Sequence, residues 1–433
     1  LLKNYLPAGE TLPAVPAALP VIEIPEFHFH KVAPLFSNLP EAKQTVDIQP
    51  MEQFNQGWGT ILYRTTLPET TLAGTTLKIT EVHDWAQIYA DGKLLARLDR
   101  RKGEFTTTLP ALKKGTQLDI LVEAMGRVNF DKSIHDRKGI TEKVELISGN
   151  QTKELKNWTV YNFPVDYSFI KDKKYSDTKI LPTMPAYYKS TFTLDKVGDT
   201  FLDMSTWGKG MVWVNGHAMG RFWEIGPQQT LFMPGCWLKE GENEILVLDL
   251  KGPTRASIKG LKKPILDVLR EKAPETHRKD GEKLKLTGEK VVHEGAFTPG
   301  NGWQEVRFAT LVKGRYFCLE ALSPQANDNI AAIAEFDVLG ADGKPVSREH
   351  WKIRYADSEE TRSGNRTADK IFDLQESTFW MTVDNVPYPH QLVIDLSKVE
   401  NVTGFRYLPR AEKGYPGMIK EYRVYVKPAD FNY

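Results

Sequence analysis

The sequence predicts an all-β protein built from tandem β-sandwiches. The first observation is the stretch from Trp207 to Trp223, which has the pattern of a tight β-hairpin. Its centre is Asn215-Gly216, because both central residues of a type I′ turn need a positive φ. Its tryptophans are a large apolar load for one hairpin, so it must pack on a second sheet. We expect Trp213 and Trp223 to be core residues.

An internal repeat is the second observation. Three blocks recur at an offset of about 125 positions: residues 63–67 at 188–192, 91–92 at 215–216, and 118–122 at 243–247. A single offset that holds over three blocks predicts two β-rich domains of about a hundred residues each. Short apolar runs separated by Gly, Pro and Asp-Gly are the third observation, and they have the spacing of a β-sandwich.

Composition excludes several classes of protein. Lys and Arg number 57 against 56 Asp and Glu, which leaves a net charge of +1. This balance gives no electrostatic reason to expect a nucleic acid or an anionic membrane as partner. Only two cysteines occur, Cys236 and Cys318, which is not a disulfide framework. No apolar run is long enough for a membrane span.

Specific motifs mark both repeats. The second repeat contains WGKG at 207–210, VWVNGH at 212–217, GRFW at 220–223 and GPQQTL at 226–231. Together these motifs resemble the last jelly roll of family 35 β-galactosidases. Residues 59–66 and 121–129 are similar to the preceding jelly roll of that family. The resemblance covers roughly residues 1 to 250, and it implies galactose-binding-like sandwiches.

The resemblance implies the accessory part of a retaining exo-β-galactosidase. In that family a catalytic barrel with two glutamates precedes these domains. A barrel needs alternating strands and helices, and this sequence lacks that alternation. No catalytic residue is therefore assigned. The expected partners are the missing barrel and β-galactoside-containing glycans, and secretion or a periplasmic location is implied. The alternative is a freestanding carbohydrate-binding or adhesin-like protein.

Motifs also divide the chain into segments. We expect a helix tail and Pro-rich linker with a strand (1–50), the first jelly roll (51–155), a connector and the second jelly roll (156–258), a charged linker (259–290) and a terminal module (291–433).

The terminal module has motifs of its own. PHQLVIDL at 389–396 and GFRYLPR at 404–410 resemble a discoidin-like carbohydrate-binding module. The closing part of such a module matches residues 314–319 and 331–336, which here come before the opening part. A circularly permuted module explains this order. The alternative is a truncated module beside an unrelated small sandwich.

This second resemblance implies two sites. Loops at one end of the sandwich are expected to bind a sugar, with His390, Arg410 and Arg366 as candidates because Arg and His donate hydrogen bonds to hydroxyls. A structural Ca²⁺ is implied at Asp373, Thr378 and Glu335, since calcium takes oxygen ligands.

A permuted order predicts where two of these calcium ligands lie. If the module is permuted, Glu335 must fold back beside Asp373. Otherwise Glu335 faces solvent and Asp373 caps a turn.

Three further polar motifs are expected to be structural. The pair His83-Asp84 is not part of a nucleophilic triad, because no Ser or Cys lies on a recognisable strained turn. Arg127 is expected to be a buttress between domains. Glu359 and Glu360 are sequence neighbours that point to opposite sides of an extended chain, so we expect exposed loop charges.

Overall fold

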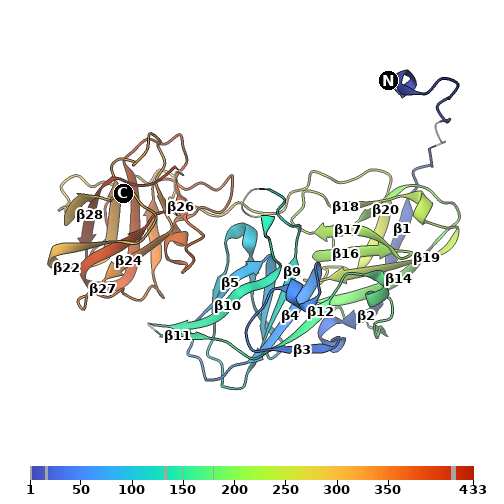
Figure 1. Cartoon of the computed structure of the whole chain (residues 1–433), viewed down its shortest axis with the longest axis horizontal. Coiled ribbons are helices and arrows are strands. Elements are labelled where there is room, and N and C mark those ends of the chain that lie inside the picture. Colours follow the sequence, from blue (N-terminus) through green and yellow to red (C-terminus); the bar gives the residue numbers. More distant parts are fainter. Residues whose placement is uncertain (1, 15–17, 131–133, 150, 179, 411–415) are drawn as a thin grey trace. The chain divides into compact units, whose positions relative to one another are not determined.

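The structure is a computed structural model that describes residues 2–14, 18–130, 134–149, 151–178, 180–410 and 416–433. The chain divides into two compact units. The first unit comprises Leu1–Pro40 and Pro164–Lys272 and holds the second jelly roll, and the second unit comprises Glu41–Phe163 and Ala273–Tyr433 and holds the first jelly roll and the terminal module. Nearly all regular elements are β-strands, as the sequence predicts (Figure 1).

The second jelly roll is a sandwich of two antiparallel sheets. One sheet has the order β1 (Ile24–His28), β20 (Ser257–Leu261), β15 (Thr200–Asp203), β18 (Thr230–Met233). The other has the order β13 (Ser176–Asp177), β2 (Lys31–Pro34), β14 (Ala186–Leu194), β19 (Gly241–Asp249), β16 (Lys209–Val214), β17 (His217–Trp223). The short helices of this unit are η1 (Leu2–Tyr5), η2 (Leu35–Ser37), α1 (Tyr167–Ile170) and η6 (Gly235–Trp237).

The segment expected to be a linker contributes to this sandwich. Strand β1 pairs with β20, and β2 pairs with β14. Helix η1 lies where the helix tail is expected, although Leu1 is outside the described residues.

The β16–β17 hairpin turns as predicted. Asn215 has φ 49° and Gly216 has φ 86°, and Val214 pairs directly with His217 across the turn. These are the positive dihedrals of a two-residue type I′ connection.

The tryptophans of this hairpin differ in burial. Trp213 is 1% exposed, which confirms its core assignment, and Trp207 is equally buried. Trp223 is only half-buried, with the Lys209 ammonium 4.0 Å from its ring centre, so its core assignment is wrong. The reason is that β17 is the last strand of its sheet, where side chains are covered incompletely.

The first jelly roll repeats this architecture. One sheet has the order β11 (Gln151–Glu154), β10 (Gly139–Ser148), β5 (Thr76–His83), β8 (Thr106–Thr108). The other has the order β3 (Ala42–Thr45), β12 (Trp158–Phe163), β4 (Gly59–Thr66), β9 (Gln117–Ala124), β6 (Trp85–Ala90), β7 (Lys93–Asp99). Its short helices are η3 (Met51–Phe54) and η4 (Arg100–Lys102). Strands β4, β9, β6 and β7 take the positions that β14, β19, β16 and β17 take in the second jelly roll, which confirms the repeat.

The terminal module is a third β-sandwich. Its main sheet has the order β21 (His293–Ala296), β28 (Glu421–Lys427), β22 (Gln304–Ala321), β27 (His390–Leu408), β24 (Glu335–Leu339), with β25 (Lys352–Ala356) also paired to β27. A small second sheet joins β23 (Ala332–Ile333) to β26 (Trp380–Met381), and η7 (Ala368–Phe372) lies between β25 and β26 in the chain.

The two halves of the terminal module form one sheet. Phe317 of β22 pairs with Ile394 of β27 on one side and with Val426 of β28 on the other. Both halves also supply one apolar core. For the strands described here, this arrangement excludes a truncated module beside a separate small sandwich. A circularly permuted order fits it (Figure 1, orange and red).

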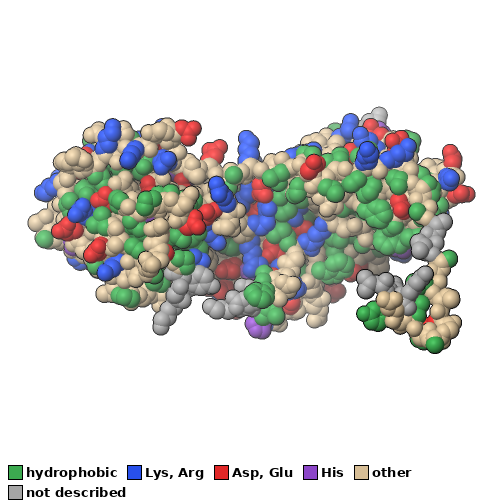
Figure 2. Space-filling model, turned by 90° about the horizontal axis from the view of Figure 1, so that it is seen from above, with side chains coloured by type: hydrophobic (Ala, Val, Ile, Leu, Met, Phe, Trp, Pro, Cys, Tyr) green, Lys and Arg blue, Asp and Glu red, His purple; other side chains and the backbone are tan. Residues whose placement is uncertain are grey.

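The surface agrees with the balanced composition. Figure 2 shows acidic and basic side chains interspersed over the face in view. In the described part of the chain, no helix is both long and apolar enough to cross a membrane.

Candidate carbohydrate-binding site of the terminal module

Two of the three candidate sugar-binding residues meet at one aromatic ring. The guanidinium carbons of Arg366 and Arg410 lie 4.2 Å and 4.3 Å from the ring centre of Phe379. Phe379 is 7% exposed and packs in a small apolar cluster with Leu408. Because the face of an aromatic ring is electron-rich, it attracts both cations and holds their side chains in place.

The backbone explains why the two arginines meet. The N–H of Arg366 donates to the carbonyl of Glu360, and the N–H of Met381 donates to the carbonyl of Arg366. These bonds fix Arg366 beside the end of β26. Arg410 lies two residues beyond the end of β27 at Leu408, and its Nη1 lies 3.9 Å from the sulfur of Met381.

His390 does not join this group. It is 0% exposed, and its Nδ1 lies 2.8 Å from a carboxylate oxygen of Asp357. Its Nε2 lies 2.8 Å from the carbonyl oxygen of Asn329. Both ring nitrogens therefore have partners inside the protein, and His390 holds two loops together at the start of β27.

The carboxylates expected to bind calcium come together. Glu335 is 2% exposed, and Thr378 Oγ1 donates to Asp373 at 2.8 Å. Glu335 lies on β24, which packs against η7, and Asp373 directly follows η7. Burial raises the pKa of Glu335 to about 8, and the charge of the Asp373 carboxylate acts in the same direction. Burial likewise raises the pKa of Asp373 to about 6. Glu335 thus folds back toward Asp373, as a permuted module requires.

Cations already lie near these carboxylates. Arg348 forms ion pairs with Glu335 and, at 2.7 Å, with Asp337. Lys370 Nζ lies 3.8 Å from Asp373. Glu335 Oε1 is nevertheless buried with no hydrogen-bond partner among the described residues. Among the described residues, no group of three or more His, Cys, Asp and Glu side chains is placed to hold a metal ion. A bound Ca²⁺ would therefore also need hydroxyl and carbonyl oxygens as ligands.

Neither Arg348 nor Asp337 was expected at this site from the sequence. A signal for Asp337 existed, since Glu335 and Asp337 are two positions apart on a strand and therefore share a face. Nothing in the sequence points to Arg348, because it comes from the following loop. Arg406 of β27 completes the network with a bond to Asp337 at 2.9 Å.

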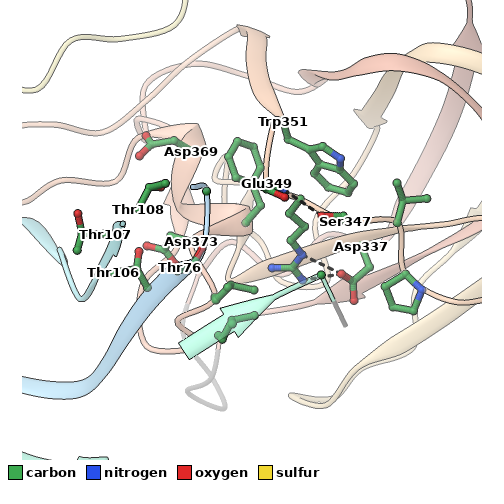
Figure 3. Close-up of a pocket in the computed structure, with 18 of the residues that line it drawn as sticks. Thr76, Thr106, Thr107, Thr108, Asp337, Ser347, Glu349, Trp351, Asp369 and Asp373 are labelled. Carbon is green, nitrogen blue, oxygen red and sulfur yellow. Dashed lines mark hydrogen bonds and ion pairs between the residues drawn. The ribbon is translucent and has the colours of Figure 1, made fainter. Parts of the chain in front are cut away.

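A pocket in the second unit opens onto this network. The Arg348 guanidinium lines this pocket and donates to Asp337 at 2.8 Å. Figure 3 shows Asp337 and Trp351 on one side of the pocket, with Asp373 further along the wall. Thr76 of β5 and residues of β8 line the other side. Asp337 pairs with both guanidiniums of the pocket, Arg348 and Arg406. Apolar side chains, among them Trp351 and Phe372, form much of the remaining wall.

A buried charge cluster holds the loops at one end of the first jelly roll. Lys138 is 0% exposed, and its Nζ donates to Asp84 at 2.6 Å and to Asp136 at 2.8 Å. Arg100 Nη1 donates to the same two carboxylates, each at 2.7 Å. Burial alone would raise the pKa of Asp136, but the hydrogen bonds from Lys138 and its neighbours lower it to about 2. Two cations and two carboxylates thus satisfy one another.

His83 and Asp84 have different partners in this cluster. His83 Nε2 lies 2.9 Å from Glu81, whereas Asp84 bonds to Lys138. His83 Nδ1 lies 3.4 Å from Asp136 instead. This geometry excludes a His83–Asp84 dyad and agrees with the structural role expected for the motif. Arg127 donates to the carbonyls of Asp136 and Gly57, so the bonds described for it lie within the first jelly roll.

Glu359 is more deeply buried than expected. Its side chain is 1% exposed and lies 2.8 Å from His277 Nδ1. It also accepts a hydrogen bond from the N–H of Ala368. The expectation of an exposed loop charge is therefore wrong for Glu359, because His277, far away in the sequence, supplies a buried partner.

Comparison with protein families agrees with these three sandwiches. Residues 49–164 match the first all-beta domain of beta-galactosidase, residues 185–243 match the galactose-binding domain of beta-galactosidase, and residues 355–433 match the F5/8 type C domain. The chain contains all-β domains of the β-galactosidase type and an F5/8 type C domain. The last match, residues 355–433, covers the motifs that open a discoidin-like module and leaves out residues 314–336, which carry its closing motifs.

Curated relatives give the same assignment. The chain is 34% identical to human beta-galactosidase-1-like protein 2 over 205 residues, which cover 46% of this chain and 30% of that protein. It is 33% identical to a beta-galactosidase of Xanthomonas manihotis, covering 52% of this chain and 36% of that protein. It is 31% identical to beta-galactosidase 1 of Dictyostelium discoideum, covering 57% and 40%. The chain thus spans 30–40% of the length of these relatives.

Proposed function

We propose that this chain supplies the accessory β-sandwiches of a retaining exo-β-galactosidase, secreted or periplasmic, in which the two jelly rolls brace a catalytic barrel. The observation that carries this proposal is the repeated sandwich of one four-stranded and one six-stranded sheet. Each copy matches a β-galactosidase domain model.

An activity assay tests this accessory role. Retaining glycosidases use two carboxyl groups about 5–5.5 Å apart that flank the scissile bond. Glu335 and Asp373 are neighbouring carboxylates, but Glu335 is 2% exposed and its Oε2 is paired with Arg348. We expect the 433-residue chain to show no turnover of a chromogenic β-galactoside above a boiled control. Turnover that Glu335→Gln abolishes would contradict the accessory role.

The terminal module is proposed to bind β-galactoside glycans. Its Arg366 and Arg410 offer guanidinium donors at the end of the sandwich, while the ring of Phe379 supports them. Calorimetric titration with galactose and galactosides tests this, with binding expected to weaken in Arg410→Ala. If no glycan of a broad panel binds at millimolar concentration, the module does not bind carbohydrate and acts only as a spacer.

A freestanding carbohydrate-binding or adhesin-like protein is the second candidate. The observation in its favour is that the terminal module forms one sandwich with its own arginine pair. The mass of the native protein distinguishes the two. A native chain near 49.2 kDa supports the freestanding protein, and a much heavier chain supports the galactosidase.

Glu335, Asp373 and Thr378 are the proposed ligands of a structural Ca²⁺. The donor set fits calcium because it offers the buried Glu335 carboxylate with an unpartnered Oε1, the half-buried Asp373 carboxylate and the Thr378 hydroxyl. The bound ion would offset the repulsion between the carboxylates and stabilise the loop after η7. We expect Ca²⁺ to raise the melting temperature of the wild type but not of Glu335→Gln. If millimolar Ca²⁺ leaves the melting temperature of the wild type unchanged, the proposed calcium site is wrong.

A further inference from the structure

Trp303 differs from the other aromatic residues of the terminal module in its exposure. It is 37% exposed, whereas every other aromatic side chain described for this module is buried or half-buried. Phe379, the ring that supports Arg366 and Arg410, is only 7% exposed. A sugar that stacks on an aromatic residue needs accessible ring surface. Trp303 offers such a surface, and Phe379 does not.

Two contacts fix the indole of Trp303. The Arg406 guanidinium lies 4.6 Å from its ring centre and covers one face. The indole Nε1–H donates to a carboxylate oxygen of Glu376 at 3.3 Å. The exposed surface therefore belongs to the remainder of the indole. Because the side chain is already held in place, a ligand that stacks there loses little side-chain entropy on binding.

Polar groups border the indole on two sides. The Glu376 carboxylate is exposed, and its oxygens are acceptors for hydroxyl groups. The Arg406 side chain is 32% exposed, and its bonds to Asp337 use Nε and Nη2. The third nitrogen, Nη1, is a donor for a hydroxyl oxygen. A ring surface with a donor and an acceptor at its border has the chemistry that recognition of a sugar requires.

The strand register places Trp303 at the same end of the sheet as Arg410. Gln304, the next residue after Trp303, pairs with Tyr407 of β27. Arg410 comes three positions after Tyr407, just beyond the end of that strand. Glu376 comes from the loop that follows η7. Segments that are far apart in the sequence therefore meet around the indole.

We infer that Trp303 is the aromatic platform of the terminal module, on which a galactose ring stacks while Glu376 and Arg406 bond to its hydroxyl groups. This inference rests on the proposed sugar-binding function of the same module and names a residue that contacts the ligand. The axial hydroxyl at C4 of galactose leaves a patch of C–H groups at C3, C4 and C5 on the opposite face of the sugar. That face packs on the indole.

The indole signals of the protein test this contact by NMR. The chain has ten tryptophans, and labelling them with nitrogen-15 gives each an Nε1–H signal. The signal that is missing in Trp303→Phe belongs to Trp303. We expect galactose and lactose to shift this signal and to leave that of Trp58, which is 45% exposed in the first jelly roll, unchanged. Saturation transferred from the protein to the sugar should be strongest at H3, H4 and H5.

Substitutions measure the contribution of the platform. Calorimetric titration of Trp303→Ala should show galactoside affinity about tenfold weaker or less, because a stacked tryptophan is lost. Trp303→Phe should retain part of the affinity, since a smaller ring remains. Trp58→Ala is the matched control, because it removes an exposed tryptophan outside the module and should leave the affinity unchanged. Melting temperatures verify that each variant is folded.

The outcomes separate this inference from the proposed function. If galactosides bind the wild type and Trp303→Ala equally well, or bind without moving the Trp303 signal, the platform is wrong and galactoside binding stands. If no galactoside binds the wild type, galactoside binding itself is wrong, and the platform with it. If Trp303→Ala fails to fold, the saturation pattern on the sugar and the indole shift of the wild type decide.

Discussion

The backbone N–H of Lys285 donates to the carbonyl of Asn432 at 2.9 Å, so the two ends of the terminal module lie side by side. Arg354 strengthens this junction through ion pairs with Glu282 at 3.2 Å and Asp430 at 2.7 Å. The end of the segment expected to be a charged linker thus belongs to the module. Adjacent ends are what a circular permutation needs, because the chain can be joined at one place and opened at another without moving a strand.

Reordering the module should leave its fold unchanged. In the test chain, residues 342–433 precede residues 281–341, with flexible linkers at the new joints. The cut falls between Ala341 and Asp342, which are exposed in a turn, and such sites tolerate new termini. We expect a melting temperature close to that of the original chain. A control chain with the cut between Phe317 and Cys318, inside β22, should fail to fold. If the chain reordered at Ala341 also fails to fold, the two ends of the module do not lie side by side as described.

Loss of Lys138 should destabilise the first jelly roll strongly. Lys138→Met leaves Asp84 and Asp136 buried with Arg100 as their remaining cation, and breaking such a buried pair costs about 3–5 kcal/mol. Denaturant unfolding measures this change. Lys143→Met is the control, because the Lys143 side chain is 44% exposed and its pair with Glu145 should contribute less than about 1 kcal/mol. Equal effects of the two variants would refute the structural role of the cluster.

Protonation of His277 should stabilise the terminal module. Burial alone lowers the pKa of His277, but the hydrogen bond to Glu359 outweighs it, and with Asp369 nearby the pKa is raised above 6.5. The contribution is present in full below the unfolded value of 6.5 and is lost as the pH rises through the higher folded value. From about pH 6 to about pH 8, the melting temperature of the wild type should therefore fall more than that of His277→Gln.

His350 provides the control for this titration. Its side chain is 77% exposed, so His350→Gln should follow the wild type across the same pH range. Parallel melting curves for wild type and His277→Gln would show that the bond to Glu359 does not contribute.

Trp213→Ala should unfold the second jelly roll or weaken it severely. The side chain is 1% exposed, and removing a buried aromatic residue costs about 3–5 kcal/mol. The free energy of unfolding by denaturant measures the loss. Trp58, which is 45% exposed, serves as the comparison, and Trp58→Ala should change stability little. An unchanged melting temperature in Trp213→Ala would disprove its core position.

Local signals predicted most of the fold. A two-residue Asn-Gly turn limits the backbone to a few conformations, so Asn215 and Gly216 fixed the hairpin without reference to the rest of the chain. The repeat likewise predicted two sandwiches with one strand order. Burial was harder to predict, because Trp213 and Trp223 have the same chemistry and differ only in whether the strand is central or at the edge.

The sequence by itself determined the β class and the repeated sandwich, and it pointed to Arg366, Arg410, Glu335 and Asp373 in the terminal module, because turns, alternation and motifs are properties of short segments. Only the tertiary structure decided what those residues contact. It buried His390 against Asp357, paired Glu359 with His277, and brought Arg366 and Arg410 to one aromatic ring, that of Phe379. These contacts join segments that are distant in the chain, and strand pairing across the whole sheet sets their distances.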